Sequence, residues 1–192
     1  MTTQNESVII VSGLPRSGTS MMMNMLVAGG IAAMTDAIRT ADEDNPKGYF
    51  ELEKVKELAR DNGWMNDAEG RAVKIISALL KHLPSGHRYK IIFMRRHMQE
   101  ILASQRQMLV RRGEPTDTVS DERMAEMFRK HLAEVEAWLA RQANIEVIYV
   151  DYNQMLEAPA PPIAAINEFL GGQLNTAAMT AVVDRTLHRQ RA

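Results

Sequence analysis

Residues 8–20 read VIIVSGLPRSGTS, and this stretch decides the fold. Its first four residues are apolar and predict a buried strand, while the polar segment after them predicts a tight turn that leads into a helix. Gly13 and Gly18 let the backbone curl, so that consecutive N–H groups point into one concavity at the positive end of that helix. The sequence therefore predicts an anion-binding loop between a strand and a helix.

The spacing of this loop nearly matches the phosphate-binding loop of nucleotide-hydrolysing proteins, in which a lysine precedes a serine or threonine. Thr19 stands where that lysine is required, and the positive side chain has moved to Arg16. A phosphoryl-transferring loop uses its lysine together with magnesium on the terminal phosphates. The missing lysine argues against a kinase or ATPase, the alternative in which residues 147–150 and Asp151 form a magnesium-binding strand.

A second motif, around Arg96, supports a different family. Residues 15–20, PRSGTS, resemble the phosphosulfate-binding loop of the sulfotransferases. Residues 89–94 predict another buried strand, Arg96 follows it, and Ser104 lies eight residues further on in a predicted helix. Sulfotransferases carry an arginine and a serine with this spacing, and both hold the 3′-phosphate of the nucleotide donor. The resemblance implies the same role for Arg96 and Ser104.

The final third of the chain is also similar to sulfotransferases. Residues 145–152 resemble the closing strand of the family, and Phe-Leu-Gly at residues 169–171 resembles its helix end. Asn153 and Gln154 replace the usual acidic pair. The resemblance therefore covers nearly the whole chain, with a specific loop and looser motifs elsewhere.

The resemblance implies a donor, 3′-phosphoadenosine 5′-phosphosulfate, and transfer of its sulfuryl group to a hydroxyl or amine of a small-molecule acceptor, without a metal. Negative charge would build on the leaving oxygen of the nucleotide. Arg16 and the backbone N–H groups of Ser17, Gly18 and Thr19 are expected to stabilise that charge. The hydroxyls of Thr19 and Ser20 are expected to bind the same 5′-phosphate.

The acceptor needs a general base, and the carboxylates before residue 52 supply two candidates. NPKGYFE, residues 45–51, resembles a segment of bacterial sulfotransferases and ends in Glu51, the first candidate base, with Asp44 second. The alternative interpretation makes Glu51 a first-turn helix acid that the helix dipole favours. His82 and His87 are further candidates, because other family members use histidine.

Composition sets limits on the function. The 192 residues suit a single domain spanning 1–192. Lys and Arg number 23 against 24 Asp and Glu, so no overall field attracts nucleic acid. There is no cysteine, which excludes thiolate chemistry and disulfides. The N-terminus does not resemble a secretory signal, and the apolar tract at residues 21–34 is too short to span a bilayer. We therefore expect a cytoplasmic protein.

The order of the predicted elements defines the fold class. Strands are expected at residues 8–11, 90–94 and 146–150, and helices at 19–28, 51–61, 71–82, after Ser120 and from Pro161. Strands separated by helices pair in parallel, so we expect an α/β three-layer sandwich with a mostly parallel sheet, a P-loop, sulfotransferase-like fold. The leading hypothesis is a sulfotransferase, and a nucleotide-binding regulatory module without turnover is another alternative.

Overall fold

The centre of the protein is a four-stranded parallel sheet, seen in a computed structural model that describes residues 7–36, 48, 50–116, 118–184 and 186. The strand order is β2-β1-β3-β4. The strands are β1 (Val8–Gly13), β2 (Ala72–Lys74), β3 (Tyr89–Arg95) and β4 (Ile145–Asp151). Because every pairing is parallel, the carboxyl ends of all four strands lie at one edge, where ligands bind in such sheets.

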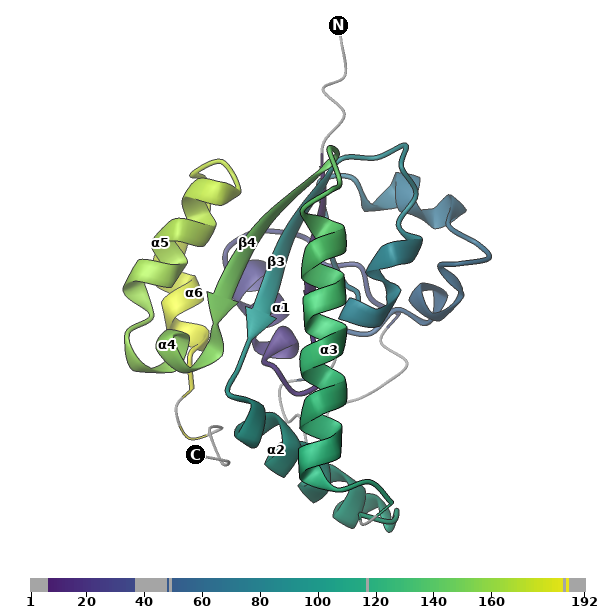
Figure 1. The fold of residues 1–192 in the computed structure, drawn as a ribbon. Helices are drawn as coiled ribbons and strands as arrows, with labels where there is room; N and C mark the ends of the chain where they lie inside the picture. The colour runs from purple at the N-terminus through teal and green to yellow at the C-terminus, as the bar shows by residue number, and fades with distance from the viewer. Residues whose placement is uncertain (1–6, 37–47, 49, 117, 185, 187–192) are drawn as a thin grey trace, which may run out of the picture.

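Helices cover both faces of the sheet, as Figure 1 shows. They are α1 (Thr19–Ala28), α2 (Met98–Arg112), α3 (Asp121–Leu139), α4 (Tyr152–Glu157), α5 (Ala160–Phe169) and α6 (Thr176–Val182). The 3₁₀ helices are η1 (Glu53–Glu57), η2 (Gly63–Ala68) and η3 (Ser77–His82).

Alternation along β1 and β3 divides the core into two clusters. Ile9 and Ile92 pack with α1, α4, α5 and α6 on one face, while Ile10 and Phe93 pack with α3 and the 3₁₀ helices on the other. Successive side chains of a strand point to opposite faces, so each central strand contributes to both clusters. This arrangement confirms the expected three-layer α/β sandwich.

The expected helix over residues 71–82 is wrong. Residues 72–74 form β2, which pairs with β1 in the register Ile9 to Ala72, and η3 follows after a two-residue gap. The expected helix over 51–61 is present only as the short η1. A three-residue strand is too short to show a period of two, and its pairing with the central β1 overrides the helical propensity of its residues.

Local signals elsewhere are confirmed. α1 spans the residues expected for it, and α3 begins after Ser120, whose hydroxyl accepts a hydrogen bond from the backbone N–H of Arg123 at 3.2 Å. Such an N-cap satisfies one of the unpaired N–H groups of the first helical turn. α1 packs on one face of β1 and β3, and α3 packs on the other.

Candidate functional site

The loop between β1 and α1 depends on three residues with positive φ. Gly13 has φ 143°, Arg16 has φ 70° and Gly18 has φ 99°. A Cβ atom on Gly13 would lie 2.7 Å from the carbonyl oxygen of Met94, and one on Gly18 would lie 2.4 Å from Cδ2 of Tyr152. The two glycines are therefore required both by their backbone angles and by the chain that passes close to them.

The interior of this loop presents polar groups that the described residues leave unbonded. The Ser17 N–H donates to the Leu14 carbonyl at 3.2 Å, but the N–H groups of Gly18 and Thr19 donate to no described residue. The Ser17 hydroxyl is buried, and no hydrogen-bond partner for it exists among the described residues. Buried polar groups are normally bonded, so these groups and the start of α1 fit an anionic ligand such as a phosphate.

The structure brings the loop into direct contact with the second motif. Arg16 donates from Nε to the Ser104 hydroxyl at 2.9 Å, although the two residues are 88 positions apart. Arg96 donates from Nη1 to the carbonyl oxygen of Arg16 at 3.0 Å. Accepting the bond from Arg16 leaves the Ser104 O–H able to donate to a ligand. Arg16, Ser104 and Arg96 therefore belong to one site at the carboxyl edge of β1 and β3.

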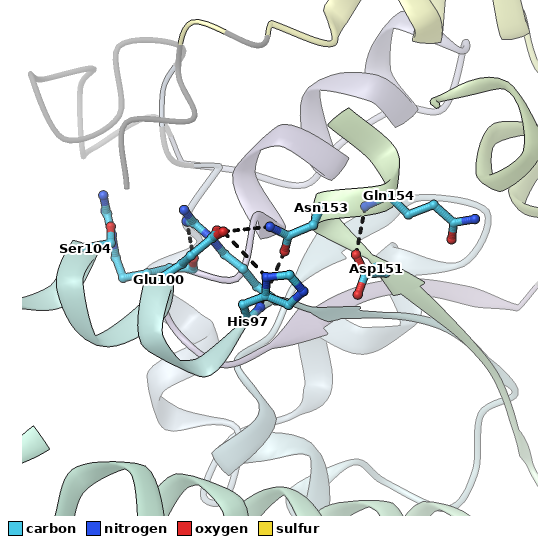
Figure 2. A network of polar contacts seen from close by, with 8 residues as sticks. His97, Glu100, Ser104, Asp151, Asn153 and Gln154 are labelled. Carbon is cyan, nitrogen blue, oxygen red and sulfur yellow. Dashed lines mark hydrogen bonds and ion pairs between the residues drawn. The ribbon is translucent and has the colours of Figure 1, made fainter. Parts of the chain in front are cut away.

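Glu100 and Asn153 form a buried polar network at the start of α2 and α4 (Figure 2), and Arg96 belongs to it. Its Nε pairs with Oε2 of Glu100 at 2.8 Å, and the two side chains are 7% and 2% exposed. Nδ2 of Asn153 donates to Oε1 of Glu100 at 2.7 Å. Glu100 and Asn153 were not identified from the sequence. Arg96 lies just before α2 and Glu100 in its first turn, and this four-residue spacing is the signal that could have indicated their ion pair.

Tyr152 connects this network to the loop. Its ring lies 4.5 Å from the guanidinium carbon of Arg96 and against Gly18. Burial raises the pKa of the Tyr152 phenol above its ordinary value, and the Arg96 charge lowers it by a smaller amount. The phenol therefore stays protonated near neutral pH, so Tyr152 supplies a packing surface rather than a base.

The candidate base Glu51 pairs with the end of β2. Its Oε1 lies 3.6 Å from Nζ of Lys74, whose side chain is 9% exposed. Lys74 is opposite Val11 of β1, so the pair lies at the carboxyl edge of the sheet, beside the strand that leads into the loop. Glu51 precedes η1, so it is not a first-turn acid of that helix. Asp44, the second candidate, lies outside the described residues.

Lys74 is a further residue that the sequence analysis missed, because it fell inside the wrongly predicted helix. The clue that could have found it is a lysine directly after two apolar residues, at a possible strand end. His87, by contrast, lies shortly before β3 begins, at the amino edge of the sheet, and its Nδ1 is 3.5 Å from Glu69. His82 ends η3.

The described part of the chain holds neither a candidate metal site nor a membrane-spanning helix. Among these residues, no group of three His, Asp or Glu side chains is arranged to hold a metal ion. No helix among them is long and apolar enough to cross a membrane.

The strand–loop–helix geometry and the adjoining arginine and serine define a P-loop protein of the α/β class. Residues 6–190 match the sequence model of the sulfotransferase domain. The chain therefore belongs to the sulfotransferase family, a family of transferases that move sulfuryl groups. No curated protein sequence matches this chain.

Several solved sulfotransferase structures have a fold similar to that of this chain, at low sequence identity. The sulfotransferase STF1 from Mycobacterium tuberculosis H37Rv is 18% identical, with a TM-score of 0.57 over 92% of this chain and 70% of its own. The sulfotransferase domain of the Synechococcus PCC 7002 olefin synthase is 15% identical, with a TM-score of 0.53 over 100% of this chain and 86% of its own. Mouse sulfotransferase SULT7A1, complexed with PAP, is 19% identical, with a TM-score of 0.50 over 96% of this chain and 64% of its own.

Proposed function

We propose that the protein transfers a sulfuryl group from 3′-phosphoadenosine 5′-phosphosulfate to a hydroxyl or amine of a small-molecule acceptor. The observation that carries this proposal is the contact between Arg16 of the loop and Ser104 of α2, since it joins the two phosphate-binding motifs in one site. The mouse sulfotransferase with this fold is complexed with PAP, the nucleotide that remains after transfer, which supports the same donor here.

In this proposal the loop binds the 5′-phosphosulfate end of the donor. The backbone N–H groups of Gly18 and Thr19, the hydroxyls of Ser17, Thr19 and Ser20, and the start of α1 provide donors for it. Arg16 adds a positive charge next to the leaving oxygen. Donors fixed before the reaction stabilise developing charge without reorganisation, and one such donor is typically worth about 10²–10³ in rate.

Transfer itself requires an activated acceptor. As the acceptor oxygen or nitrogen forms its bond to sulfur, the bond from sulfur to the bridging oxygen of the nucleotide breaks, and the acceptor gives up a proton. Glu51 is the proposed base that takes this proton. The ion pair with Lys74, whose Nζ lies 3.6 Å from Oε1 of Glu51, supports this role because it holds the carboxylate at the end of β2.

The first test is selective loss of the 3′-phosphate contact. Arg96→Ala should weaken the binding of adenosine 3′,5′-bisphosphate by about 1.5–3 kcal/mol, the range for hydrogen bonds to charged groups. The binding of 5′-AMP should be nearly unaffected. Titration calorimetry measures both affinities. Arg95→Ala is the matched control, because this neighbouring arginine pairs with Glu136 and lies over the Tyr149 ring instead. Equal losses for both nucleotides in Arg96→Ala contradict the 3′-phosphate role.

The second test separates donor binding from turnover. Glu51→Gln should abolish sulfuryl transfer and retain affinity for the bisphosphate, because the amide cannot accept the proton. Transfer to a panel of phenols, sugars and lipids with free hydroxyls is measured in parallel with nucleotide affinity. Nucleotide binding without transfer to any of them would indicate a regulatory module. Tight binding of ATP with magnesium, and none of the bisphosphate, would indicate a kinase or ATPase.

A further inference from the structure

Asn153 is a buried amide whose two polar ends both contact the segment that follows β3. It is the second residue of α4 and is 8% exposed. Its Nδ2 donates to Oε1 of Glu100 at 2.7 Å, and its Oδ1 accepts from the backbone N–H of His97 at 3.4 Å. Figure 2 shows Asn153 and Glu100 pointing toward one another, with Gln154 pointing away. The amide is therefore held in one orientation.

The two carboxylate oxygens of Glu100 contact Asn153 and Arg96, and Oε1 also lies 3.6 Å from Nδ1 of His97. Oε1 accepts from Asn153, and Oε2 accepts from Nε of Arg96 at 2.8 Å. The Glu100 side chain is only 2% exposed. A buried carboxylate is costly unless its oxygens are bonded, so these two contacts fix its rotamer.

Arg96 is in turn held on three sides. Glu100 binds the Nε edge of the guanidinium, Tyr152 lies under its plane at 4.5 Å, and Nη1 donates to the Arg16 carbonyl at 3.0 Å. A guanidinium tied at Nε has its terminal nitrogens directed away from that tie. Here Nη1 is directed toward the loop that, under the proposed function, binds the donor.

We propose that Asn153 and Glu100 are positioning residues that orient Arg96 for the 3′-phosphate of the donor, without touching the nucleotide themselves. This inference rests on the proposed function, since it concerns the same site. It adds a chain of contacts from α4 through α2 to the phosphate-binding arginine, and it makes Asn153 act only through Arg96.

A double-mutant cycle on nucleotide affinity tests this dependence. Asn153→Ala should weaken the binding of adenosine 3′,5′-bisphosphate about two- to tenfold, the fold-change that corresponds to one hydrogen bond, and leave the affinity for 5′-AMP unchanged. In an Arg96→Ala background, Asn153→Ala should have no further effect, because the residue it orients is gone. Gln154→Ala is the matched control on the same helix and should leave both affinities unchanged.

Failure of the positioning role and failure of the proposed function are distinguishable. An Asn153→Ala loss that persists in the Arg96→Ala background, or that is equal for both nucleotides, overturns the positioning role while leaving the proposed function intact. Failure of the unmodified protein to bind the bisphosphate overturns the proposed function itself. Asn153→Ser, which replaces the amide donor to Glu100 with a shorter hydroxyl, repeats the cycle if thermal unfolding shows that Asn153→Ala is not folded.

Discussion

Replacing Gly18 by alanine is expected to destabilise the protein through one specific collision. The new Cβ would lie 2.4 Å from Cδ2 and 3.0 Å from Cε2 of Tyr152. Tyr152 is 6% exposed, with Arg96 over its ring, so the ring has little room to move. The φ of 99° is also one that residues with side chains rarely adopt. Both effects act at the start of α1, in the loop that follows β1.

Gly30 separates these two effects, because it shares the backbone angle but not the crowding. Its φ is 105°, and a Cβ there would have nothing within 4 Å. The left-handed conformation costs about 1–2 kcal/mol with a side chain, so Gly30→Ala should lose about that much. Overpacking adds about 1–3 kcal/mol, so Gly18→Ala should lose roughly 2–5 kcal/mol in total.

Urea unfolding of both variants measures the free energy of unfolding, and thermal unfolding gives a second reading. The additional 1–3 kcal/mol should lower the Tm of Gly18→Ala by roughly 2–12 °C more than that of Gly30→Ala. Tyr152→Leu should reduce the cost of Gly18→Ala, because it removes the colliding ring. If Gly18→Ala costs no more than Gly30→Ala, the contact between the loop and Tyr152 is not as described.

Two other substitutions test the ion pairs and the helix cap. Glu100→Ala removes the carboxylate that pairs with the buried Arg96 and should cost about 3–5 kcal/mol in urea unfolding. Glu126→Ala, which breaks the exposed pair with Arg123, should cost less than about 1 kcal/mol, and similar losses for the two variants would contradict the burial argument. Ser120→Ala should cost about 1 kcal/mol in the same assay, because the first turn of α3 loses its cap, and an unchanged midpoint would show that the hydrogen bond contributes nothing.

Several features of the fold and site were predictable because short-range interactions determine them. The strand–loop–helix unit around Arg16 follows from an apolar run, two glycines and a helix start within 13 residues. The α3 helix follows from its amphipathic repeat and its Ser120 cap. The ion pair between Arg96 and Glu100 joins residues only four positions apart, although the sequence analysis did not identify it. In each case the interacting groups are close in sequence, so their spacing carries the information.

The sequence by itself thus determined the strand–loop–helix unit, the central strands and the residue types of the proposed donor site. Only the tertiary structure decided that β2 is a strand, that Lys74 pairs with Glu51, and that Asn153 contacts Glu100 from 53 residues away. These contacts join segments that are distant in the chain. They depend on how the parallel strands are ordered and on which face each side chain occupies, and no local spacing records either of these.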